Sequence, residues 1–148
     1  MLSQIKKFAL LVMISFLGAC QAPNISTDVA TEIAEKFIAA TTSANYDEAF
    51  KLVNEKEFFI VRDRETWIEY YKAISKELGP IISVKLSRHQ ADDRFSGRFY
   101  TYQFSIKHEG GFTKEIVTLI QEINTKEELK VFAHRIEGGK LAKINSRF

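Results

Sequence analysis

The spacing of apolar residues changes at Gly79-Pro80, and this change constrains the fold more than any other feature of the chain. Before it, apolar residues recur every three or four positions, which is typical of amphipathic helices. After it, apolar and polar residues alternate, which is typical of strands with one buried face. A chain that is helical first and extended afterwards is predicted to form an α+β domain with its helices on one face of an antiparallel sheet.

Three helices are predicted before Gly79-Pro80. The first begins at a capping residue among Ser26, Thr27 and Asp28 and ends in the Thr-Thr-Ser run at 41–43. The second is shorter and covers residues 45–54, and the third begins at Asp63 and ends at Gly79. Residues 58–61 have the composition of a strand but lie between two helical patterns, so we interpret them as a link or one helical turn.

Four strands are predicted after Pro80. Residues 82–86 alternate as a half-buried strand, residues 90–96 form a polar loop, and residues 98–107 alternate again. A hairpin turn at 108–111 leads to a strand over 113–123, and a turn at 124–128 leads to a last strand over 129–136. We expect the domain to end at Gly138-Gly139. Residues 138–148, with Lys140, Lys143 and Arg147, are then a solvated basic tail.

The first 20 residues have the features of a secretory signal. Lys6 and Lys7 precede an apolar run over 8–16, and small residues come just before Cys20, the only cysteine of the chain. The apolar stretch is shorter than the about 20 residues that a membrane-spanning helix needs. The end of this stretch resembles the lipobox of bacterial lipoproteins, with the residues Leu17, Gly18, Ala19 and Cys20.

The lipobox resemblance implies that residues 1–19 are a signal peptide and that Cys20 becomes the first residue of the mature protein. It further implies a thioether-linked diacylglycerol and an N-linked acyl group such as palmitate, which together hold a protein on the bilayer. Residues 20–27 then form the lipidated cysteine and a tether, and residues 28–137 form the folded domain. Because Gln21 follows the cysteine, where aspartate would resemble an inner-membrane retention signal, we expect an outer-membrane protein that faces the periplasm.

Without residues 1–19 the chain carries no net formal charge. The full sequence has 21 Lys and Arg against 19 Asp and Glu, and the signal contains Lys6 and Lys7 but no acid. A neutral domain has no overall attraction to nucleic acid, so we expect no nucleic-acid partner. With Cys20 acylated, no thiol remains for a disulfide. The domain must then be held by packing, which suits a chain with 12 phenylalanines.

Landmark residues occur in the predicted helices and strands, namely Tyr46, Phe50, Trp67, Leu78-Gly79 and the runs 97–100, 113–119 and 129–131. With these landmarks, residues 31–136 resemble a family of bacterial exported proteins, the domain-of-unknown-function family numbered 4019. That family lies in the superfamily of nuclear transport factor two and ketosteroid isomerase. The resemblance implies a cystatin-like cone, in which three N-terminal helices pack on a curved four-stranded antiparallel sheet with a pocket between them.

An enzyme of the ketosteroid isomerase or dehydratase kind needs a carboxylate inside such a cone. Glu115 and Glu122 are the acids nearest to inward positions, and the sequence leaves open whether Glu115 points inward with its neighbours Val117 and Leu119 or pairs with a lysine at the rim. The three histidines are His89, His108 and His134. No two of them have metal-ligand spacing and no second cysteine exists, so we expect no metal and no cofactor.

Aromatic residues are numerous enough to line a ligand pocket, but at helix and strand spacing they can equally form a plain core. The pocket-lining candidates are Phe37, Trp67, Tyr71, Tyr100, Tyr102 and Phe104.

Two functions are compatible with these residues. The first is a membrane-anchored envelope lipoprotein that does not catalyse a reaction and binds a partner protein or a small apolar ligand. The second is an isomerase- or dehydratase-like enzyme that uses Glu115 as a base in an aromatic-lined pocket. The opposite sheet face, which includes Phe99, Thr101 and Ile116, is a candidate homodimer interface.

Overall fold

The computed structural model describes residues 26–122 and 128–148. The predicted signal peptide, the lipobox with Cys20, and most of the predicted turn at 124–128 lie outside the described residues. Within them, no helix combines the length and the apolar character that a membrane crossing requires.

Two long helices begin at side-chain caps. In α2 (Thr27–Thr42) the Ser26 hydroxyl accepts a hydrogen bond from the backbone N–H of Val29 at 3.4 Å. In α5 (Arg64–Leu78) the Asp63 carboxylate accepts one from the N–H of Thr66 at 2.8 Å. These bonds satisfy amide groups that have no partner inside a helix. Two short helices join them. α3 (Tyr46–Lys51) lies within the predicted second helix, whereas α4 (Glu55–Phe58) is a further helix, which ends where the sequence predicts a link or one helical turn.

Gly79 ends α5 with a φ of 75° and opens the chain into the first strand. Glycine suits this position because it has no Cβ to clash in the left-handed region. The strands are β1 (Ile81–Arg94), β2 (Gly97–His108), β3 (Gly111–Glu122) and β4 (Lys130–Glu137). They form one antiparallel meander in the order β1-β2-β3-β4, which confirms the predicted fold class.

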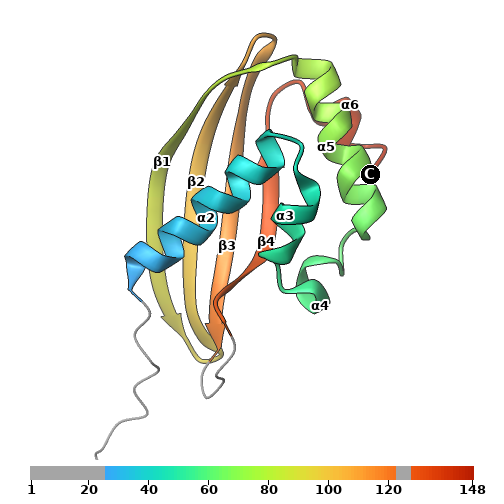
Figure 1. The fold of residues 1–148 in the computed structure, drawn as a ribbon. Coiled ribbons are helices and arrows are strands. Elements are labelled where there is room, and N and C mark those ends of the chain that lie inside the picture. Colours follow the sequence, from blue (N-terminus) through green and yellow to red (C-terminus); the bar gives the residue numbers. More distant parts are fainter. Residues whose placement is uncertain (1–25, 123–127) are drawn as a thin grey trace, which may run out of the picture.

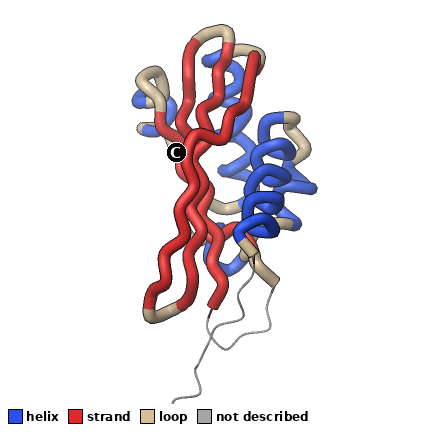
Figure 2. The backbone as a smooth tube through the Cα atoms, turned by 90° about the vertical axis from the view of Figure 1, so that its left-hand side faces the viewer, coloured by secondary structure: helices blue, strands red, loops and turns tan. Residues whose placement is uncertain are grey.

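The helices cover one face of the curved sheet. Figure 1 shows α2 crossing in front of the strands, with α3, α4 and α5 beyond the β4 side, and Figure 2 shows that the opposite face carries no helix over most of its length. Alternation along β2 directs Tyr100, Tyr102, Phe104 and Ile106 into the core, where each is at most 2 % exposed. The core therefore lies between this concave face and the helices.

The predicted polar loop at 90–96 is wrong for residues 90–94. They continue β1 as far as Arg94 and pair with residues 97–101 of β2. β1, an edge strand of the sheet, is also exposed along most of its length rather than half-buried. A strand that is exposed on both faces needs no alternation of apolar and polar residues, so the polar sequence of residues 90–94 indicated a loop.

The predicted basic tail is packed against the domain. Residues 138–148 contain α6 (Ala142–Asn145), in which Ile144 is buried, and Leu141 just before it is completely buried. The Tyr70 hydroxyl donates a hydrogen bond to Oδ1 of Asn145 at 2.7 Å, and the Phe148 ring lies 5.5 Å from the Tyr70 ring. Lys140, Lys143 and Arg147 are exposed, as expected for the outer side of this segment.

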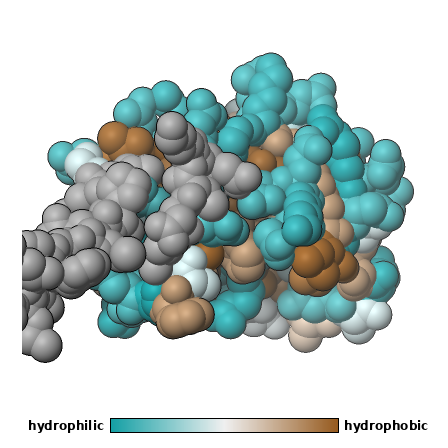
Figure 3. Space-filling view, turned by 90° about the horizontal axis from the view of Figure 1, so that it is seen from below, coloured by the Kyte–Doolittle hydropathy of each residue, from teal (hydrophilic) through white to brown (hydrophobic). Residues whose placement is uncertain are grey.

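The molecular surface seen from below is largely hydrophilic, with hydrophobic residues in separate groups (Figure 3). Exposed large apolar side chains include Phe95 in the β1–β2 turn and Phe112 at the start of β3. On the outer face of the sheet the Phe99 and Phe132 rings are 6.4 Å apart. The homodimer interface on that face stays a prediction.

Candidate functional site

A buried chain of hydrogen bonds connects α5 to the sheet. The Tyr71 hydroxyl lies 2.8 Å from Nδ1 of His134, and Nε2 of His134 lies 2.9 Å from Oε2 of Glu115. The three residues are 5–6 % exposed and come from α5, β4 and β3 respectively. Groups that are far apart in the sequence thus form one polar cluster inside an otherwise aromatic core.

The strand register explains how His134 reaches Glu115. Glu115 points inward with Val117 and Leu119 because alternate residues of β3 face the core. In the β3–β4 pairing Val117 lies opposite His134, so His134 and Glu115 are diagonal neighbours. A register shift beside Thr118 and Leu119 brings both Val131 and His134 to the buried face, although they are three positions apart.

A second branch reaches Glu115 from the end of β2. Nδ1 of His108 lies 3.2 Å from the carbonyl oxygen of Gly79, and since a carbonyl only accepts, this nitrogen carries a proton. Nε2 of His108 lies 3.4 Å from the Thr113 hydroxyl, which in turn lies 3.4 Å from Oε1 of Glu115. The single Thr113 proton can point to either neighbour. Both contacts are longer than an ordinary hydroxyl hydrogen bond, so they hold Glu115 less firmly than His134 does.

Protonation of Tyr71 sets the direction of the first branch. Burial, and then the negative charge of Glu115, raise the pKa of the Tyr71 hydroxyl well above its ordinary value. The hydroxyl therefore stays protonated, and it donates to Nδ1 of a neutral His134 ring because the other ring nitrogen, Nε2, faces a carboxylate that can only accept. Nε2 of His134 then carries the ring proton and donates to Oε2 of Glu115, an arrangement that suits a neutral imidazole and an ionised carboxylate.

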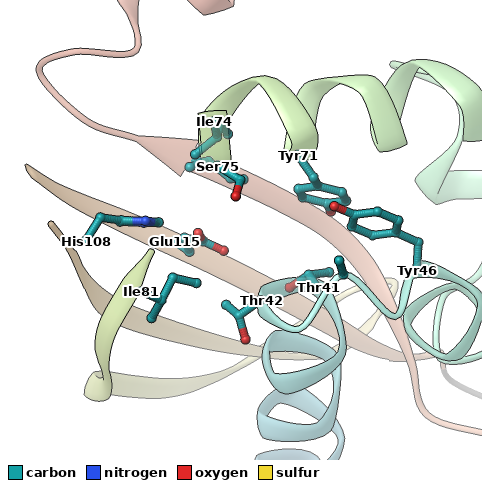
Figure 4. A pocket seen from close by; sticks show the side chains of 11 residues that line it. Thr41, Thr42, Tyr46, Tyr71, Ile74, Ser75, Ile81, His108 and Glu115 are labelled. Carbon is teal, nitrogen blue, oxygen red and sulfur yellow. The ribbon is translucent and has the colours of Figure 1, made fainter. Parts of the chain in front are cut away.

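A small cavity of about 60 Å³ borders this cluster. Figure 4 shows the Glu115 carboxyl group and His108 on one side of it and Tyr71 and Tyr46 on the other, with Ser75 above and Thr42 below. His134 is not among the lining residues and lies behind Glu115. Since a water molecule occupies about 30 Å³ in the liquid, the cavity can hold roughly two waters or one small polar group.

A larger groove of about 350 Å³ lies between α2 and β1. Thr42 borders both the groove and the cavity. The groove is mainly apolar, with the lining residues Glu35, Ile38, Ala39, Thr42, Val84, Leu86 and Phe104.

The predicted site residues separate into three groups. Glu115 takes the inward position that the sequence left open, whereas Glu122 is exposed, so its predicted inward position is wrong. Tyr71 borders the cavity and Phe104 borders the groove. The remaining pocket-lining candidates are buried in the core and border neither space, namely Phe37, Trp67, Tyr100 and Tyr102.

Two histidines, His108 and His134, belong to the site, although their sequence context gave them no role. His108 was expected in a turn but is the last residue of β2 and is buried. His89 lies on the exposed strand β1 and stacks on Tyr102 with ring centroids 6.2 Å apart. Within residues 26–122 and 128–148 no group of three or more His, Cys, Asp or Glu side chains could hold a metal ion.

No protein-family model and no curated protein matches the chain. Solved structures are similar to it in fold. They include a nuclear transport factor two-like (NTF2-like) protein from Cytophaga hutchinsonii, with 16 % identity, a TM-score of 0.53, and coverage of 77 % of this chain and 99 % of that one. A candidate ketosteroid isomerase from Shewanella frigidimarina has 14 % identity, a TM-score of 0.50, and coverage of 72 % and 92 %.

A third similar structure is the protein Bd1075 of Bdellovibrio bacteriovorus, with 10 % identity and a TM-score of 0.52. The match covers 74 % of this chain but only 39 % of that longer protein. At these identities the similarity concerns the fold and not the activity. The chain therefore has an NTF2-like fold, which is the fold that the sequence landmarks imply.

Proposed function

We propose that the protein is a lipoprotein of the bacterial envelope, anchored in the outer membrane by acylated Cys20, whose NTF2-like domain binds a small and largely apolar ligand without catalysing a reaction. The observation that carries the binding role is the cavity beside Glu115, which shares the lining residue Thr42 with an apolar groove. A partner protein, the other ligand class compatible with the sequence, would have to insert a side chain into the same space.

The size of the cavity limits which part of a ligand can enter it. Pockets that hold whole small molecules usually measure about 300–1,000 Å³, whereas this cavity measures about 60 Å³. It can therefore receive one end of a ligand but not a complete substrate. The groove, which measures about 350 Å³, has room for the apolar remainder of the ligand.

The anchor is tested by the variant Cys20→Ser expressed from the full-length gene. We expect the wild-type protein in the membrane fraction, with an intact mass that shows loss of residues 1–19 and the addition of acyl chains. The variant should keep the leader or appear in the soluble fraction. Recovery of the wild-type protein with Cys20 unmodified would contradict the anchor.

The binding role is tested with n-hexanol, a neutral probe with a short apolar chain. We expect chemical-shift changes in an NMR titration at residues that line the groove, such as Ile38, Leu86 and Phe104. Exposed Phe95, in the β1–β2 turn, serves as the reference for non-specific contact. Shifts of equal size at Phe95 and in the groove, or no shifts at all, would contradict the proposal.

A second candidate function is proton transfer by Glu115 in an isomerase- or dehydratase-like reaction. It is favoured by a buried carboxylate that borders the cavity and accepts a hydrogen bond from His134, since a base needs an oriented carboxylate. Deuterium exchange into small ketones in D₂O tests it. If the enzyme reading holds, Glu115→Gln should slow the exchange by about 10²–10⁴-fold. Exchange that is equal in the wild type and in Glu115→Gln would exclude this function for those substrates.

A further inference from the structure

We propose that the ligand is a primary alkylamine, whose ammonium group occupies the cavity against Glu115 and whose alkyl chain lies in the groove between α2 and β1. This inference rests on the proposed binding function and adds the chemical class of the ligand.

The sheet register places the two parts of the site side by side. Leu86 of β1 pairs with Phe104 of β2, and Phe104 pairs with Glu115 of β3. These residues form one row across the concave face, and neighbouring strands lie about 4.8 Å apart. The distance from the acid to the far side of the groove is therefore roughly 10 Å, which an alkyl chain of modest length can span.

Glu115 is the single acid in this row, and the row continues on β4 with Ile136. One of its oxygens, Oε2, accepts the short hydrogen bond from His134. The other, Oε1, is approached by the Thr113 hydroxyl at 3.4 Å, which is longer than an ordinary hydroxyl hydrogen bond. Oε1 consequently keeps the capacity to accept a further, stronger hydrogen bond, and Glu115 is one of the residues that line the cavity.

An ammonium group matches this space in charge, size and hydrogen bonding. It carries three donors and no acceptor, so it can bond to Oε1 of Glu115 and to hydroxyl oxygens on the cavity wall, such as those of Thr41 and Ser75. A cavity of about 60 Å³ has room for this group and about one water. A ligand carboxylate would meet the charge of Glu115 and be repelled. Glu35 adds a second acid to the groove lining, which also favours a cation.

The test compares n-hexylamine with n-hexanol and hexanoate by calorimetric titration of the full-length protein in detergent. Because a hydrogen bond to a charged group is about twice as strong as a neutral one, we expect hexylamine to bind about tenfold more tightly than hexanol and hexanoate to bind least. Methylamine, which lacks the chain, should bind more weakly than hexylamine by about two- to fourfold for each missing methylene.

Three variants locate the effect. Glu115→Gln should remove the advantage of hexylamine over hexanol, whereas Glu122→Gln, an exposed acid on the same strand, should keep it. Val84→Lys, at a groove position that is 44 % exposed and tolerates a long side chain, should weaken hexylamine binding at least tenfold. Val84→Lys provides a second test of the site if Glu115→Gln does not fold. Thermal melting checks the folding of each variant.

The outcomes distinguish the inference from the proposed function. If hexanol binds in the groove and hexylamine binds no better, or if Glu115→Gln leaves the advantage of hexylamine intact in the folded protein, the amine inference is overturned and the binding function stands. If none of the three hexyl compounds binds, both are overturned.

Discussion

Replacing Tyr71 by Phe tests whether the buried hydrogen-bonded chain holds α5 on the sheet. The substitution removes one hydroxyl and keeps the ring, so the stacking contacts with Tyr46 at 5.6 Å and Trp67 at 5.4 Å are retained. Any loss of stability then comes from the hydrogen bond to Nδ1 of His134, which the hydroxyl makes at 2.8 Å.

The size of the loss follows from burial. The His134 side chain is completely inaccessible, so without Tyr71 its Nδ1 atom becomes a buried acceptor with no donor. An unsatisfied buried polar group costs about 1–3 kcal/mol. Since Tyr71 borders the cavity, a water can replace part of the lost bond, and we expect a loss of about 1–2 kcal/mol in the free energy of unfolding. The control Tyr46→Phe, at a half-buried tyrosine, should change it by less than about 0.5 kcal/mol.

The assay is urea-induced unfolding at neutral pH, combined with ¹⁵N NMR of the histidine rings. In the wild type the His134 ring should carry its proton on Nε2 alone, and in Tyr71→Phe the signal of Nδ1 should move because its hydrogen bond is gone. Equal stability of Tyr71→Phe and Tyr46→Phe, or a His134 ring protonated on Nδ1 in the wild type, would refute the assignment of the chain.

The same variant tests how the free energy of unfolding depends on pH in the alkaline range. Burial raises the pKa of Tyr71 above that of a tyrosine in the unfolded chain, which is about 10. The unfolded state therefore ionises first. The stability that Tyr71 contributes is fully present below pH 10 and is lost as the pH rises from there through the folded-state pKa. We expect unfolding free energy to fall above about pH 10, and to fall less steeply in Tyr71→Phe.

Two further substitutions test the fold. Gly97→Ala places a Cβ 2.2 Å from the carbonyl oxygen of Gln121 at a φ of 153°, so it should lower the free energy of unfolding by about 1–3 kcal/mol. The control Gly139→Ala, whose Cβ has no atom within 4 Å, should have little effect in the same urea titration. Leu141→Ala removes a completely buried side chain and should lower the free energy of unfolding by about 2–4 kcal/mol. The control Lys143→Ala, at an exposed residue, should change it by less than about 0.5 kcal/mol. Equal effects of the two substitutions would mean that the C-terminal segment does not belong to the core.

The parts of the fold that the sequence predicted are those with a strong period and a clear end. The helix before Gly79 has apolar residues at helical spacing and a glycine that its backbone geometry requires. The strand over 98–107 alternates without interruption, and its buried face is the predicted one. Burial of one face is what creates such patterns, so elements with one buried face are the ones that can be predicted.

The elements that the sequence did not predict either have no buried face or have one that their composition obscures. Residues 90–94 are polar and exposed, and backbone pairing with β2 makes them a strand. At the C-terminus, Leu141, Ile144 and Phe148 do have helical spacing, but the surrounding lysines, arginine and two glycines indicated a solvated tail. A four-residue helix has too few positions for its period to outweigh composition.

For the site, the sequence left the inward position of Glu115 open and could not place His134 beside it. Alternation on one strand gives the face of each residue relative to its neighbours on that strand. The pairing of Glu115 with His134 depends on the register between β3 and β4, which includes an irregularity beside Thr118 and Leu119. A one-residue change in register would turn His134 away from the core, and single-strand patterns contain no information about it.

A purely structural role, in which Glu115 anchors α5 to the sheet, explains the hydrogen bonds of Glu115 but not the cavity beside it. A buried carboxylate must be paired, and the chain through His134 to Tyr71 achieves this while joining α5 to two strands. Protein interiors are close-packed, however, and here a cavity of about 60 Å³ borders Glu115. If Glu115 served only as an anchor, Glu115→Gln would lower stability and leave ligand affinity unchanged. If the space receives a cationic group, the same substitution must lower affinity in a protein that still folds, and comparing the two measurements decides between these roles.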